Sequence, residues 1–128
     1  MARILIVEDD NDLRASLVTA LADEFEVLAV SDGTAAVRSL REDRVDLILL
    51  DMVMPGGDGF TVLGHVARMN PRPMVVVLSV LDQVNKVVKA MRLGANDYLV
   101  KPCHLDKLRS VLRHTLTAAT PGVLTSQR

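Results

Sequence analysis

The chain has 128 residues and a formal net charge of −1, which suits one compact domain and argues against a basic surface that binds nucleic acid by itself. A single cysteine excludes an intrachain disulfide and argues against a cysteine-rich zinc site. No apolar run is long enough to span a bilayer, so we expect no membrane segment and a cytoplasmic location.

Five apolar segments are predicted to be β-strands, and each is followed by a segment with helical periodicity. The strands are Ile4–Val7, Glu26–Val30, Asp46–Leu50, Met74–Ser79 and Asp97–Val100. The first, third and fourth are continuous apolar runs, which are typical of strands covered on both faces of a parallel sheet. The second and fifth are more mixed and suit the edges of the sheet.

The segments after the strands carry apolar residues at the spacing of one helix face. These residues are Leu13, Leu17 and Leu21; Ala36, Val37 and Leu40; Phe60, Leu63 and Val66; Val84, Val87, Val88 and Met91; and Leu105, Leu108, Leu112 and Leu116. Alternating strands and helices predict an α/β domain with right-handed crossovers. The periodicity is lost in the last stretch of the chain, so we expect the domain to occupy residues 1–118. Residues 119–128 would form a tail or the start of a linker to an effector domain.

Polar side chains stand at the carboxyl ends of four predicted strands. Glu8-Asp9-Asp10 follows the first, Asp51 the third and Lys101 the fifth, while Ser79 closes the fourth. Because ligands of a doubly wound sheet bind beyond these ends, we expect the groups to share one site. Oxygen ligands without histidine or cysteine favour Mg²⁺. A carboxylate there can form an acyl phosphate, with an ammonium and a hydroxyl group contacting the phosphoryl oxygens.

The order of these residues resembles the receiver domain of two-component response regulators. The matching landmarks are Glu8-Asp9, Asp51-Met52-Val53-Met54-Pro55 with Asp58-Gly59, Ser79, and the segment from Gly94 to Pro102. The resemblance covers roughly Ala2 to Leu116. It implies a flavodoxin-like, doubly wound (βα)5 fold, with a five-stranded parallel sheet of order 2-1-3-4-5 and helices on both faces.

The resemblance also implies how the site works. Asp51 would accept a phosphoryl group from a histidine kinase or a phosphotransfer protein, and the domain would hydrolyse its own phosphoaspartate. Asp9, Asp51 and the backbone carbonyl of Val53 would ligate Mg²⁺ (or Mn²⁺) directly. Glu8 would act on the metal through water, and Lys101 would contact the phosphoryl group.

A conformational switch is the second implication of the resemblance. Ser79 and Tyr98 would be the switch pair, and the peptide bond before Pro102 would be cis. The fourth helix, fifth strand and fifth helix would form the surface for output or for a homodimer. Its candidate residues are Lys86, Lys89, Arg92 and Tyr98, the first three of which are predicted to lie opposite the apolar stripe of the fourth helix. A solvated basic face is the alternative interpretation.

Two positions depart from the family pattern. Val80 stands where a small residue is usual and would crowd the approach to Asp51, and Cys103 stands where an aromatic residue is common. Neither change removes a reactive group, so both bear on rates. Asp10 and Asn11 are interpreted as helix-capping residues, and Cys103 as packing without a lowered thiol pKa.

Three other functions fit the sequence less well than a phosphorylation switch. A degenerate receiver that binds partners without phosphorylation is disfavoured by the complete set of landmarks. A phosphatase with an aspartyl nucleophile would commonly carry a second acid at the position of Val53. A flavin carrier of the same topology would need stacking aromatic residues and a hydroxyl-rich phosphate loop, and neither is present.

Overall fold

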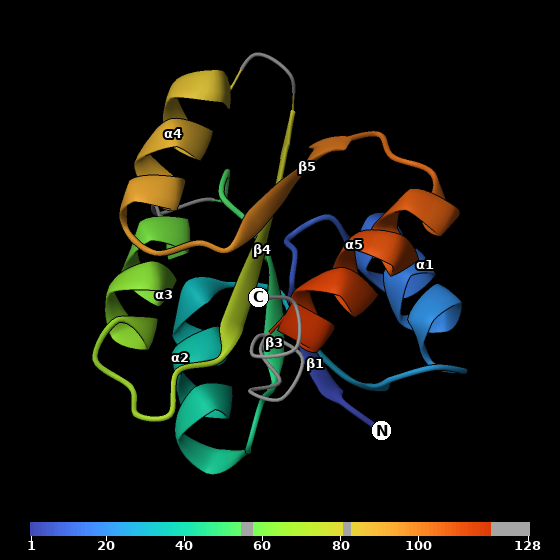
Figure 1. Ribbon diagram of the computed structural model, residues 1–128, viewed down its shortest axis with the longest axis horizontal. Coiled ribbons are helices and arrows are strands. Elements are labelled where there is room, and N and C mark those ends of the chain that lie inside the picture. Colours follow the sequence, from blue (N-terminus) through green and yellow to red (C-terminus); the bar gives the residue numbers. More distant parts are fainter. Residues whose placement is uncertain (55–57, 81–82, 119–128) are drawn as a thin grey trace, which may run out of the picture.

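The computed structural model describes residues 1–54, 58–80 and 83–118. Within them, five strands alternate with five helices (Figure 1). The elements are β1 (Arg3–Val7), α1 (Asn11–Leu21), β2 (Glu26–Val30), α2 (Gly33–Glu42), β3 (Leu47–Asp51), α3 (Asp58–Val66), β4 (Met74–Val80), α4 (Val84–Arg92), β5 (Asp97–Lys101) and α5 (Leu105–Ala118). The predicted tail, residues 119–128, lies outside the described residues.

The strands form one parallel sheet of order β2-β1-β3-β4-β5, which confirms the predicted topology. Helices α2, α3 and α4 cover one face of the sheet, and α1 and α5 cover the other (Figure 1). The two strands with mixed sequences, β2 and β5, are the edges. Three strands extend one residue past their predicted ends, because the ladder pairs Asp51 with Leu78 and Val80 with Lys101.

The core lies on both faces of the sheet because neighbouring residues of a strand point to opposite sides. Leu5 and Val7 of β1 face the α2 and α3 side, and Ile4 and Ile6 face the α1 and α5 side. All four are fully buried. Burying each such side chain stabilises the fold by about 1.5–3 kcal/mol. This packing fixes the central strands, and therefore the positions of the polar residues at their carboxyl ends.

Helix α4 is buried along a narrower stripe than its sequence pattern suggests. Of the four residues of its predicted apolar stripe only Val87 is buried, together with Ala90. Val84, Val88 and Met91 are 59%, 44% and 36% exposed. Because α4 packs near the β5 edge of the sheet, a narrow line of contact is buried and the rest of the stripe faces outward.

The three basic residues of α4 are all exposed, and Arg92 is the one that lies nearest to the apolar stripe. Lys86 is exposed, Lys89 Nζ lies 4.4 Å from the centroid of the Phe60 ring in α3, and Arg92 borders the outward-facing apolar stripe. With about 3.6 residues per turn, positions three apart drift round a helix by about 60° at each step. Lys86 and Arg92 therefore point in different directions.

The start of α1 is capped as predicted. Asp10 is the N-cap residue, and its side chain accepts a hydrogen bond of 3.0 Å from the N–H of Leu13. Asn11 is the first helical residue and accepts from Arg14 instead of capping the helix. The predicted cis peptide bond between Lys101 and Pro102 is present, and a second lies between Asn70 and Pro71. Among the described helices, none has the length and apolar character needed to cross a bilayer.

Arg109 of α5 joins the two helices that cover one face of the sheet. Its NH2 nitrogen donates a hydrogen bond of 2.6 Å to the carbonyl of Ala20 and lies 3.4 Å from Asp23 Oδ1. We expect Arg109→Met to lower the free energy of unfolding by about 1 kcal/mol, because the charge-assisted hydrogen bond is lost while the apolar stem is kept. Urea unfolding followed by circular dichroism measures this. Lys107→Met, at an exposed position of the same helix, is the control, and an equal loss in both variants would contradict the prediction.

Candidate functional site

Three carboxylates gather at the carboxyl ends of β1 and β3. Glu8 and Asp9 directly follow β1, and Asp51 is the last residue of β3. One oxygen from each of the three side chains lies within 4.8 Å of the others. Parallel strands end at the same edge of a sheet, so the fold itself brings together residues that are more than forty positions apart.

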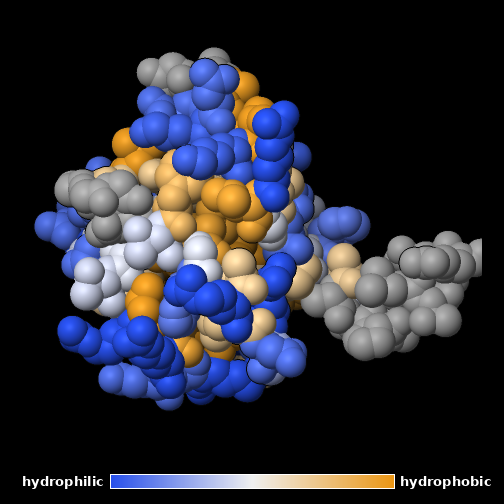
Figure 2. Space-filling model, turned by 90° about the vertical axis from the view of Figure 1, so that its left-hand side faces the viewer, coloured by the Kyte–Doolittle hydropathy of each residue, from blue (hydrophilic) through white to orange (hydrophobic). Residues whose placement is uncertain are grey.

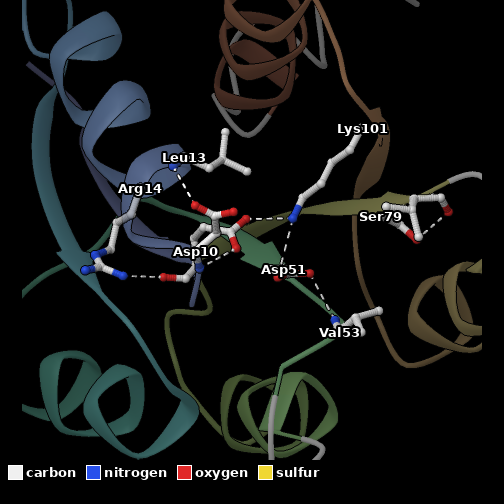
Figure 3. Close-up of polar contacts among 9 residues, drawn as sticks. Asp10, Leu13, Arg14, Asp51, Val53, Ser79 and Lys101 are labelled. Atoms are coloured by element: carbon white, nitrogen blue, oxygen red, sulfur yellow. Dashed lines mark hydrogen bonds and ion pairs between the residues drawn. The ribbon is translucent and has the colours of Figure 1, made fainter.

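Lys101 is the cation of this site. It ends β5 and extends toward the acidic cluster (Figure 3). Its ammonium nitrogen lies 2.7 Å from Glu8 Oε1 and 3.4 Å from Asp51 Oδ2. The Glu8 and Asp51 residues are only 1% and 3% exposed. Lys101 therefore holds together two buried carboxylates that would otherwise repel each other.

The carboxyl group of Asp51 is unusually easy to protonate. Burial is the main cause that raises its pKa to about 7, and the carboxylate of Glu8 also raises it. A hydrogen bond of 3.0 Å from the N–H of Val53 to Oδ1 and the charge of Lys101 lower it. Near neutral pH the group is thus divided between its two protonation states, and any added cation favours the ionised, nucleophilic one.

The pKa of Lys101 is raised. Burial by itself lowers this pKa, but the hydrogen bond to Glu8 and the charges of Asp51 and Glu8 together outweigh it. Lys101 is therefore a fixed positive charge across the physiological pH range, held beside the oxygen of Asp51. A fixed charge at that place can stabilise negative charge that develops on a group bound to Asp51.

The oxygen atoms of the cluster fit a small divalent cation. Asp9 is exposed, so its carboxylate can reach an ion that enters from solvent, while Glu8 and Asp51 form the buried side. Opposite ligands of octahedral Mg²⁺ at about 2.1 Å are about 4.2 Å apart. Adjacent ligands are about 3 Å apart, so the three oxygens, which lie within 4.8 Å of one another, have to move closer together to bind one ion. The N–H of Val53 contacts Asp51, and the metal-binding role of the Val53 carbonyl stays a prediction.

The two predicted switch residues lie in different surroundings. Ser79 is buried, and its hydroxyl donates a hydrogen bond of 3.2 Å to the carbonyl of Val80. Figure 3 shows this contact to one side of the Asp51 and Lys101 pair. Tyr98 is 46% exposed in this conformation. Their action as a switch stays a prediction.

An apolar groove of about 380 Å³ lies between α4 and β5. It is lined by Val80, Val84, Val87, Val88, Met91, Arg92, Tyr98 and Val100. Figure 2 shows the helical side that includes α4, where hydrophobic surface lies between hydrophilic side chains. Val80 is 42% exposed and lines this groove. Its crowding of Asp51 stays a prediction.

Cys103 follows the cis-proline and is half-buried. Burial raises the pKa of its thiol, which confirms that the thiol pKa is not lowered. A thiol of raised pKa forms little of the reactive thiolate at neutral pH, so Cys103 is a packing residue.

Two contacts of the site are not predicted by the sequence. The first is that of Lys101, which is predicted to contact a phosphoryl group. In this structure its shortest contact is with Glu8. The second contact is that of Arg14, whose guanidinium donates hydrogen bonds to the carbonyl of Glu8 and to Asn11 Oδ1. The spacing from Asn11 to Arg14 on a helix was the available signal, because residues three apart are neighbours.

The sequence matches the family of response regulator receiver domains over residues 4–113. Among curated relatives, the transcriptional regulatory protein PrrA of Mycobacterium bovis is 41% identical over 123 residues, which are 92% of this chain and 53% of PrrA. The response regulator protein FleR of Pseudomonas aeruginosa is 39% identical over 122 residues, 94% of this chain and 26% of FleR. The chain thus spans between a quarter and about half of these relatives.

Solved receiver domains have the same architecture. That of NtrX from Brucella abortus superposes with a TM-score of 0.82 at 29% identity, over 88% of this chain and 97% of that one. The N-terminal receiver domain of a two-component response regulator from Bacteroides fragilis gives 0.84 at 26% identity, over 93% and 99%. Both therefore align with nearly all of their own length.

Proposed function

Because the chain belongs to the family of response regulator receiver domains, we propose that Asp51 accepts a phosphoryl group in a reaction that needs Mg²⁺ or Mn²⁺. The donor is a phosphohistidine of a histidine kinase or a phosphotransfer protein. An oxygen of Asp51 attacks phosphorus, the P–N bond of the donor breaks, and the imidazole leaves with a proton from solvent. The observation that carries this proposal is the buried Asp51 carboxylate beside both an acidic cluster and Lys101.

Each neighbour of Asp51 has a task in this reaction. Glu8, Asp9, Asp51 and the carbonyl of Val53 are the residues that would hold the metal ion, which supplies positive charge to the phosphoryl oxygens. Lys101 supplies a second positive charge, since its ammonium already lies 3.4 Å from Asp51 Oδ2. Catalysis then rests on positioning and charge stabilisation, and the same site hydrolyses the phosphoaspartate slowly.

Phosphorylation would act as a switch. It adds about −1.5 to −2 charge and new acceptor oxygens at Asp51, which attract the hydroxyl of the buried Ser79. Movement of Ser79 would release space into which the exposed ring of Tyr98 turns. The surface of α4, β5 and α5, with Lys86, Lys89 and Arg92, would then change its affinity for an output partner or for a second copy of the chain.

The curated relatives are longer than this chain, and this supports the predicted division of the polypeptide. Residues 1–118 would be the receiver domain, and residues 119–128 a tail or the start of a linker to an effector domain. Any binding to DNA would belong to that effector domain, because the receiver is nearly neutral. A phosphohistidine donor of this type would place the reaction in the cytoplasm.

The proposal is tested by incubating the protein with acetyl phosphate and Mg²⁺ and measuring its intact mass. We expect a gain of one phosphoryl group that disappears when the metal is chelated. Asp51→Asn should abolish the gain, because an amide is not a nucleophile for phosphorus. Asp43→Asn, which removes an exposed carboxylate at the end of α2, should leave it unchanged. No gain in the unmodified protein would instead favour a degenerate receiver that binds partners without phosphorylation.

A further inference from the structure

Arg14 contacts the loop between β1 and α1. This loop carries Glu8 and Asp9, the acidic partners of Asp51 in the site. The NH1 nitrogen of Arg14 donates a hydrogen bond of 2.9 Å to the carbonyl of Glu8, and its NH2 nitrogen donates one of 2.6 Å to Asn11 Oδ1. Asp9 lies between these two anchor points in the sequence. Figure 3 shows the Arg14 guanidinium beside this loop, on the side away from Lys101.

Glu8 is also held by other contacts, one of which is its ion pair of 2.7 Å with Lys101. The N–H of Glu8 is bound to the carbonyl of Val30, and the carboxylate of Glu8 accepts a hydrogen bond of 3.1 Å from the N–H of Asp10. Asp9 itself is exposed. Its position therefore depends on how firmly the backbone on either side is held, and Arg14 is the side chain that bridges both sides.

We propose that Arg14 is a positioning residue that keeps Glu8 and Asp9 in the geometry needed to bind a divalent cation with Asp51. This inference rests on the proposed function. The fork of a guanidinium suits it, since two nitrogens in fixed relative positions can bind two acceptors at once.

Loss of the bridge should weaken metal binding more than it weakens the fold. Partners that orient metal ligands are typically worth about 10- to 100-fold in metal affinity, and Arg14 acts through the backbone. We therefore expect Arg14→Ala to raise the dissociation constant for Mg²⁺ about tenfold. Asn11→Ala removes one of the two contacts and should raise it about threefold.

The experiment is a titration of the protein with Mg²⁺, followed by ¹H–¹⁵N NMR shifts of the loop amides. Arg38→Ala is the matched control, because it removes an exposed positive charge from α2. In parallel, acetyl phosphate labelling is measured against Mg²⁺ concentration. The half-saturating concentration should rise about tenfold in Arg14→Ala, while the rate at saturating Mg²⁺ stays within about twofold of the unmodified protein. A residue with only a structural role would not separate the two quantities.

Arg14→Lys separates the bridge from the charge. A lysine keeps the charge but cannot bind both acceptors at once, so we expect Arg14→Lys to lose most of the Mg²⁺ affinity that Arg14→Ala loses. Full recovery of affinity in Arg14→Lys, or the same affinity in Arg14→Ala and Arg38→Ala, would overturn the inference. If Arg14→Ala does not fold, unchanged affinity in Asn11→Ala overturns it as well. Failure of the unmodified protein to bind Mg²⁺ or gain mass would refute the proposed function itself, which is a different result.

Discussion

Replacing Lys101 with methionine is expected to slow the phosphorylation of Asp51 by acetyl phosphate at least ~100-fold at saturating Mg²⁺. The reason is the fixed ammonium 3.4 Å from Asp51 Oδ2, which meets negative charge on the transferred group without having to reorganise. Removing one such preorganised group typically costs about 10²–10³ in rate. Intact mass measured over time gives the rates, and Lys107→Met is the control because it removes an exposed charge from α5.

The same substitution should destabilise the protein. Without Lys101, the Glu8 and Asp51 carboxylates are buried together with no cation between them. We expect the free energy of unfolding to fall by about 2–3 kcal/mol near neutral pH in the absence of Mg²⁺. The loss should shrink when Mg²⁺ is added, since the ion replaces the missing charge. Rates within threefold of the unmodified protein, or a stability loss equal to that of Lys107→Met, would contradict this account of the site.

The strand-end residues show why most of the fold and the main site could be predicted from the sequence. Continuous apolar runs at β1, β3 and β4 gave the buried central strands, and a parallel sheet aligns their carboxyl ends by geometry. The topology of the sheet therefore brings together Glu8, Asp9, Asp51 and Lys101, whatever the details of side-chain packing in the core. The sequence patterns that predicted the structure correctly were those compatible with only one arrangement, namely buried parallel strands with their carboxyl ends at one edge of the sheet.

Helix α4 shows where such patterns stop. Its sequence has a clean apolar stripe, yet Val84 and Val88 face outward, because the stripe on a helix near a sheet edge can exceed the surface available to cover it. Periodicity reports which residues share a side of the helix and not how much of that side is buried. Tyr98 is exposed for a related reason, since it lies on the edge strand β5.

Polar contacts between a side chain and the backbone were the other limit. The hydrogen bond from Arg14 to the carbonyl of Glu8 depends on the path of the loop that follows β1. The sequence contains no sign of that path beyond the capping residue Asp10. The pairing of Lys101 with Glu8 rather than with Asp51 alone likewise follows from the rotamers of two long side chains, which no residue spacing determines.

Asp51→Asn is expected to stabilise the protein in a pH-dependent manner. The folded pKa of Asp51 is raised to about 7 from an ordinary value of 3.8, so the folded state binds its proton more tightly than the unfolded state does. The stability that comes from the protonated group is complete below the unfolded pKa. It falls as the pH rises toward about 7 and is lost above it. Asparagine stays neutral throughout, so its advantage should be small at about pH 4 and reach about 4 kcal/mol at about pH 8 without Mg²⁺. Urea unfolding at both pH values measures the difference, with Asp43→Asn as the exposed control.

Because a bound cation favours the ionised carboxylate, Mg²⁺ at the higher pH should stabilise the unmodified protein and reduce the advantage of the variant. An advantage that does not change with pH would show that ionisation of Asp51 does not destabilise the folded protein.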